Sequence, residues 1–167
     1  MINSLQAQTV KKLPLEKLKV LDICQHIFKH AEEFYQYLAE AHQEHREVAR
    51  MWGLFAIDKC NHSDTFKMAS RLKGEGISEV CVSAEIATNI LTKMKSIPTG
   101  DGPSPPSIVD ALRFAITMEE RLNNVYFRHV VKLCNEQDKD LLASSLKSNG
   151  TIIHMMTEEY VNQTMFE

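Results

Sequence analysis

The chain has 167 residues, of which 44% are hydrophobic and 25% are charged, a balance that is typical of a folded globular protein. Nineteen basic and 22 acidic residues give a net charge of −3, so the chain as a whole has no attraction for nucleic acid or for an anionic membrane. The length fits a single domain over residues 1–167, and no apolar run approaches the ~20 residues of a membrane span.

The N-terminal residues, MINSLQAQTVKKLPLEKLK, lack the apolar core of a signal peptide, and we therefore expect a cytoplasmic protein. The four cysteines form no CxxC motif, and most of them lie within helical patterns. We expect them to be reduced core residues, not partners in disulfides or zinc ligands. They are Cys24, Cys60, Cys81 and Cys134.

Apolar residues recur at helical spacing over four long stretches, at about 15–45, 46–73, 107–130 and 136–163. Gly74 and Gly76 mark the end of the second stretch, as glycines commonly do at helix C-termini. Ser107 and Asp110 resemble a capping box at the start of the third. The scarcity of glycine and proline, with 6 and 5 residues, argues against an all-β sandwich.

Residues 74–106 separate the second stretch from the third. They contain a shorter helical pattern from Ser83 to Ser96, followed by a proline- and glycine-rich run over 97–106 that no regular element tolerates. The other connections are tight, so the long stretches pair into two antiparallel hairpins. We therefore predict an all-α fold, a ferritin-like four-helix bundle with a long crossover at 74–106 that contains a short helix.

The two hairpins also resemble each other. An offset of 91 residues places Tyr35 on Tyr126, and an offset of 92 residues places His62 on His154. A change of one residue in the offset at the hairpin loop is typical of a duplicated helical hairpin.

Particular residues recur along these stretches. A Phe-Tyr pair ending at Tyr35 follows Phe28 in the first stretch, and a Val-Tyr pair ending at Tyr126 follows Glu119 in the third. The second and fourth stretches contain Ala-x-x-Lys-x-x-His and Ser-x-x-Thr-x-x-His. Over about residues 15–163 these features resemble the rubrerythrin-like branch of the ferritin-like superfamily. In that branch the odd helices carry Glu followed by an aromatic-Tyr pair, and the even helices carry Ala-x-x-Glu-x-x-His.

The resemblance implies a di-iron site of six ligands, in which each even helix supplies a carboxylate and an imidazole one turn apart. Four family carboxylates supply a charge of −4, whereas Glu119 and a protonated Lys59 sum to zero. Two Fe²⁺ ions would lie nearly uncompensated in a low-dielectric interior, so the charge count argues against a di-iron centre. The positions retained are His62, Glu119 and His154, and those replaced are Phe28, Lys59 and Thr151.

The first hypothesis is a rubrerythrin-like metal-binding protein that holds at most one divalent ion. Two histidines and one carboxylate, here His62, Glu119 and His154, can hold Fe²⁺, Mn²⁺ or Zn²⁺ with open positions. The chain has no paired CxxC motifs of a rubredoxin module. Activity as a non-haem iron oxidoreductase would therefore need an external electron donor, which the sequence does not name.

Other polar residues could take part in this centre. Asp58 shares a helix face with His62. Glu32 lies one turn beyond Phe28, which occupies the position of a family glutamate. Either carboxylate could therefore act as a substitute ligand. Tyr35 and Tyr126 could donate hydrogen bonds to the site carboxylates.

The second hypothesis is a non-catalytic bundle that serves as a binding or scaffold protein. In this interpretation Lys59 pairs with Glu119, and the polar centre holds no metal. For either hypothesis we expect a homodimer, both by the resemblance and because a bundle of two hairpins often buries an outer apolar stripe against its own copy.

Overall fold

The computed structural model describes residues 13–73, 77–100, 104–122, 131–133 and 136–165 of the chain. Most of these residues are helical, so the predicted all-α class is confirmed. The described helices are α1 (Leu15–Ala41), α2 (Arg46–Arg71), α3 (Ala84–Lys95), α4 (Ile108–Leu122) and α5 (Glu136–Thr164), and the described strands are β1 (Ile77–Val80) and β2 (Val131–Leu133). None of the helices within this part of the chain is both long and apolar enough to cross a membrane.

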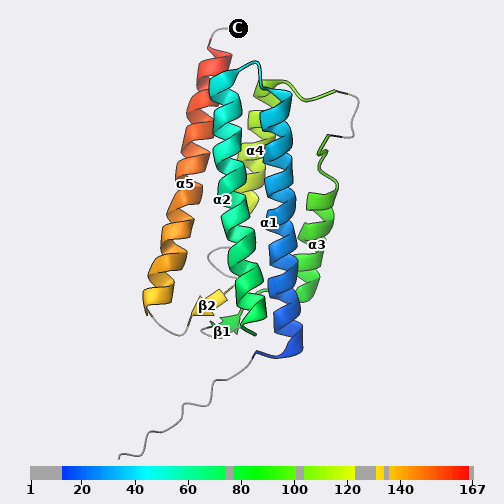
Figure 1. Ribbon diagram of the computed structural model, residues 1–167, viewed down its shortest axis with the longest axis vertical. Coiled ribbons are helices and arrows are strands. Elements are labelled where there is room, and N and C mark those ends of the chain that lie inside the picture. Colours follow the sequence, from blue (N-terminus) through cyan, green and yellow to red (C-terminus); the bar gives the residue numbers. More distant parts are fainter. Residues whose placement is uncertain (1–12, 74–76, 101–103, 123–130, 134–135, 166–167) are drawn as a thin grey trace, which may run out of the picture.

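The long helices lie nearly parallel to one another (Figure 1). Helices α1 and α2 are antiparallel neighbours joined by the short turn at residues 42–45. Helix α3 then runs back along α1, so the chain enters α4 at the end of the molecule opposite to the end of α2. Helices α4 and α5 form the second antiparallel pair. Helix α3 lies between α2 and α4 in the chain, where the sequence predicted a short helix.

Local capping explains several helix boundaries. The Ser83 hydroxyl accepts a hydrogen bond from the backbone N–H of Ile86 (3.2 Å), which fixes the predicted start of α3. The Ser107 hydroxyl accepts from the N–H of Asp110 (3.1 Å) and donates to the Asp110 carboxylate (2.8 Å), as expected for the start of α4. Past the end of α2, Lys73 has a φ of 54°, the left-handed conformation that commonly ends a helix.

Two strands were not predicted from the sequence. Strand β1 pairs antiparallel with β2, with Ile77 opposite Leu133 and Val80 opposite Val131. Runs of four and three residues are too short to show a period-two pattern, and Ile77 and Val80 are buried by the rest of the fold. The third long helix was expected to continue to residue 130. Its described part is α4, and residues 123–130, which include Tyr126, lie outside the described residues.

The core lies where α1, α2 and α4 face one another. Its members recur at helical spacing along the inner face of each helix. The α1 face carries Leu21, Phe28 and Tyr35, which are fully buried. The α2 face follows the series 52, 55, 59, 62 and 66, whose side chains are also buried. This series places one lysine and one histidine among aromatic residues, and the candidate site is built there.

Candidate functional site: a buried lysine–glutamate–tyrosine cluster

A buried ion pair joins α2 to α4. Lys59 Nζ lies 2.8 Å from Glu119 Oε2, and both side chains have 0% exposure. Lys59 occupies an inner position of α2, one turn from Phe55 and one turn from His62, so its helix directs it into the core. Glu119 likewise continues the inner face of α4 beyond Ala115. The contact between Lys59 and Glu119, one of the two alternatives expected for this centre, is present.

Tyr35 of α1 forms a hydrogen bond with the same carboxylate. Its hydroxyl donates to Glu119 Oε1 over 2.7 Å, so each oxygen of Glu119 accepts from a different helix. Burial, and next the negative charge of Glu119, raise the pKa of Tyr35 well above its ordinary value, so the phenol keeps its proton at neutral pH. The Tyr35 ring stacks on Trp52 with centroids 5.8 Å apart. The cluster therefore ties three helices together through one carboxylate.

Asp58 and His62 lie next to this cluster on α2. Asp58 Oδ2 is 3.4 Å from Lys59 Nζ and 3.5 Å from His62 Nδ1. Phe28 packs edge-on against the His62 ring, as its predicted place beside the histidine requires. Burial, with a smaller effect of the Lys59 charge, lowers the pKa of His62 to about 4 against the opposing effect of Asp58. His62 is therefore a neutral imidazole at pH 7.

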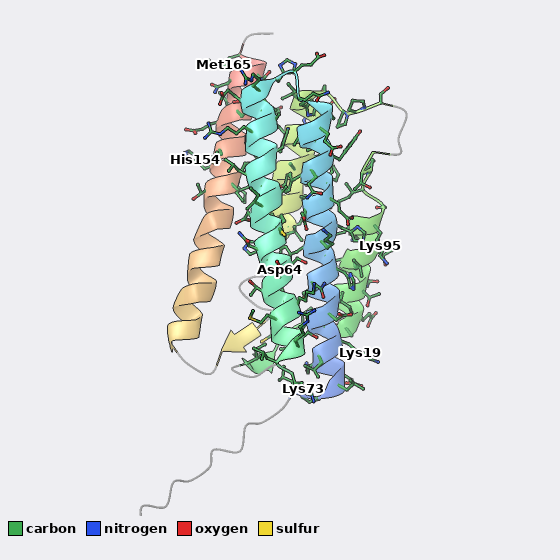
Figure 2. All side chains as sticks on the ribbon, viewed as in Figure 1. Lys19, Asp64, Lys73, Lys95, His154 and Met165 are labelled. Carbon is green, nitrogen blue, oxygen red and sulfur yellow. The ribbon has the colours of Figure 1, made fainter. Side chains whose placement is uncertain are left out.

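The structure corrects the predicted place of His154. Its side chain is 72% exposed, and Nε2 lies 3.4 Å from Glu158 Oε1 on the outer surface of α5 (Figure 2). The buried face of α5 passes through Ile152 and Met156, and a residue midway between them points about 200° away from each. Thr151, also expected at the centre, is exposed. The three ligands predicted from the sequence therefore do not converge.

The residues present do not fit the metal centre that the resemblance implies. Lys59 already occupies one oxygen of Glu119, Tyr35 occupies the other, and His154 lies outside. Across the described ranges, no three His, Cys, Asp or Glu side chains are grouped in an arrangement that could hold a metal ion. The substitute carboxylate Glu32 is buried, but its oxygens accept from the Lys29 ammonium and the Gln36 amide, both at 3.0 Å and both on α1.

Comparison of the chain with protein-family models, with curated proteins and with solved structures finds no match. The likeness to rubrerythrin-like proteins therefore depends on the spacing of residues in this sequence alone. Sequence reasoning missed the role of Trp52, which stacks on the Tyr35 ring beside the cluster. Its position on the same inner stripe as Lys59 was the signal that could have identified it.

Proposed function

We propose that the protein is a non-catalytic helical bundle of the ferritin-like, rubrerythrin-like type that serves as a binding or scaffold protein. Its centre is held by a protein cation in place of a metal ion. The observation that carries this proposal is the 2.8 Å contact between Lys59 and Glu119, both completely buried. An ammonium at this place supplies the positive charge that a buried carboxylate requires, so the fold needs no metal for charge balance.

The same contacts argue against catalysis at the centre. A catalytic centre needs an accessible position for substrate and a group with unfilled capacity to bind or to transfer a proton. Here both Glu119 oxygens accept hydrogen bonds, and the side chains of Lys59 and Glu119 have no exposed surface. The cluster is therefore suited to fixing the relative positions of α1, α2 and α4, which a scaffold requires.

A single divalent ion is the second proposal, and the protonation state of His62 favours it. A metal ligand must be a neutral imidazole, and the lowered pKa of His62 keeps it neutral, with the Asp58 carboxylate 3.5 Å away. Binding of Fe²⁺, Mn²⁺ or Zn²⁺ there would require Glu119 to exchange Lys59 for the ion. Redox activity as a non-haem iron oxidoreductase would also require an external electron donor.

Metal analysis separates the two proposals. The protein is made without a polyhistidine tag in medium supplied with iron, manganese and zinc, and the ions per chain are measured by mass spectrometry. We expect far less than one ion per chain, both in the wild type and in Glu119→Gln. Near-stoichiometric metal in the wild type that is lost in Glu119→Gln would overturn the first proposal and support the second. His154→Gln is the matched control, because its exposed side chain contributes to neither centre.

The homodimer stays a prediction from the resemblance. Light scattering at micromolar concentration should give twice the mass of the 19.1 kDa chain. A monomer under these conditions would remove the prediction without affecting the proposed centre.

A further inference from the structure

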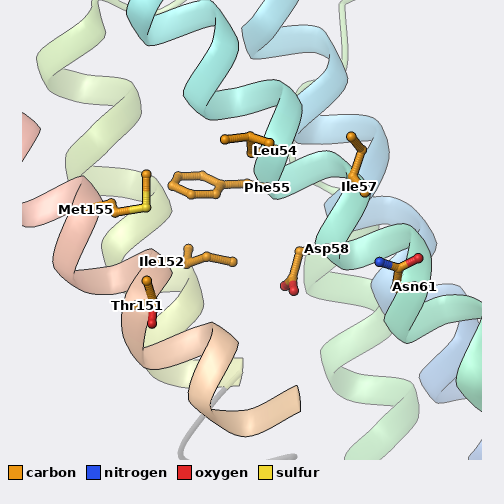
Figure 3. A pocket seen from close by; sticks show the side chains of 8 residues that line it. All are labelled: Leu54, Phe55, Ile57, Asp58, Asn61, Thr151, Ile152 and Met155. Atoms are coloured by element: carbon orange, nitrogen blue, oxygen red, sulfur yellow. The ribbon is translucent and has the colours of Figure 1, made fainter. Parts of the chain in front are cut away.

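A groove lies between α2 and the middle of α5 (Figure 3). It is an open depression on the surface, with a volume of about 360 Å³. Most of its lining is apolar, and three polar side chains contribute to it. The lining residues are Leu54, Phe55, Ile57, Asp58, Asn61, Thr151, Ile152 and Met155.

Three of the five apolar side chains that line this groove are exposed, while Phe55 and Ile152 are buried. Ile57 is 60% exposed, Leu54 is 49% exposed and Met155 is 36% exposed. Single exposed apolar residues are common on protein surfaces, but here three of them line one concave site. An apolar ligand segment placed in the groove would remove their surface from water, which is favourable by about 25 cal/mol per Å².

Charge at the floor of the groove selects the kind of ligand. Asp58 lines the groove and contacts the buried centre, where two carboxylates, Asp58 and Glu119, face the one ammonium of Lys59. Asp58, Glu119 and Lys59 together therefore carry a formal charge of −1 beneath an apolar surface, which attracts a cation and repels an anion.

We propose that the groove binds a small amphiphilic cation, with an apolar body against Leu54, Ile57 and Met155 and one primary ammonium toward Asp58. The Asn61 and Thr151 side chains lie on opposite sides of the same groove (Figure 3). This inference deepens the proposed binding role and rests on it, since it names the chemical class that the bundle takes up.

Matched ligands that differ only in their polar group test the inference. Hexylamine, hexanol and hexanoate are titrated into the full chain at pH 7, with affinities from calorimetry and the location from amide chemical shifts. We expect hexylammonium to bind at least tenfold more tightly than hexanol, and hexanoate to bind most weakly. Shifts should concentrate around 54–61 and 151–155. Equal affinities for the amine and the alcohol, or shifts centred elsewhere, would overturn the proposal.

Two variants keep this test decisive. Asp58→Asn should lower the affinity for hexylammonium about tenfold and leave the affinity for hexanol unchanged, whereas the exposed Asp64→Asn on the same helix should change neither. Leu54→Arg places a fixed cation on an exposed edge of the groove, and it should weaken hexylammonium binding and strengthen hexanoate binding. If neither Asp58→Asn nor Leu54→Arg changed the selectivity for hexylammonium over the other two ligands, the inference would be contradicted. Metal content is measured separately, so failure here leaves the proposal for the Lys59–Glu119 centre standing.

Discussion

Helix α2 contributes to two sites of opposite character. On its inner face, Lys59 is paired with Glu119, and all polar atoms of that carboxylate are engaged. On the face toward α5, Leu54 and Ile57 are largely exposed beside Asp58. A satisfied buried cluster fixes the fold and offers little to a ligand, whereas exposed apolar surface beside a charge offers free energy to a ligand. Stability and binding therefore belong to different faces of one helix.

Removing one partner of the buried pair should have the largest effect. Lys59→Met keeps much of the side-chain volume but leaves the Glu119 carboxylate uncompensated in the interior. We expect the free energy of unfolding to fall by about 3–5 kcal/mol, as for other broken buried ion pairs. Urea unfolding followed by Trp52 fluorescence measures it. Adding Glu119→Leu to this variant should recover part of the lost stability. If the double variant lost as much stability as the two single variants added together, the pairing would be contradicted.

Lowering the pH should reduce the free energy of unfolding through protonation of His62. Because its folded pKa of about 4 lies below the ordinary value of 6.5, the unfolded chain binds more protons between these values. This contribution to stability is present above about pH 6.5 and is lost as the pH falls toward 4, up to a few kcal/mol. Unfolding curves from pH 7 to 4 should show the loss in the wild type and a smaller loss in His62→Phe. The exposed His154→Gln should follow the wild type, and identical profiles for all three proteins would refute the assignment.

Loss of the Tyr35 hydroxyl should have a smaller effect. Tyr35→Phe keeps the ring stacked on Trp52 but removes the donor to Glu119 Oε1. We expect a loss of about 1–3 kcal/mol in the free energy of unfolding, because a charged acceptor loses one of its two hydrogen bonds. Tyr37→Phe, with a partly buried ring of the same helix, is the matched control. A Tyr35→Phe variant as stable as this control would show that the hydrogen bond does not hold the cluster.

The inner face could be predicted from the sequence, whereas the place of α5 could not. The series 52, 55, 59, 62 and 66 predicts one buried stripe, which turns Lys59 into the core. The expectation that Lys59 meets Glu119 came from the resemblance, and the structure has this contact. In α5, however, the apolar side chains project from several sides of the helix, so the sequence does not show which side is buried. These residues are Ile152, Ile153, Met155 and Met156. Packing selects Ile152 and Met156, and this choice turns His154 outward.

The groove also escaped prediction for a physical reason. Leu54 and Ile57 look like ordinary members of an amphipathic helix, and their exposure depends on how α5 lies against α2. Spacing along one helix gives no information on this distance. The pairing of β1 with β2 was missed for the same reason, since it depends on contacts between residues far apart in the sequence.

The most direct test of the central claim compares the wild type with Lys59→Glu in their response to metal. This change restores a Glu-x-x-His pair with His62 and changes the formal charge of the Lys59–Glu119 pair from 0 to −2. Thermal unfolding is measured anaerobically for wild type and variant, each with a chelator, with Fe²⁺ and with Mn²⁺. Repulsion between the two buried carboxylates should lower the unfolding temperature of the variant in the chelator. The wild type, in which the Lys59 ammonium already balances the Glu119 carboxylate, should unfold at the same temperature with and without the ions. A wild type whose unfolding temperature rises with ion concentration, or a variant as stable as the wild type in the chelator, would contradict the account.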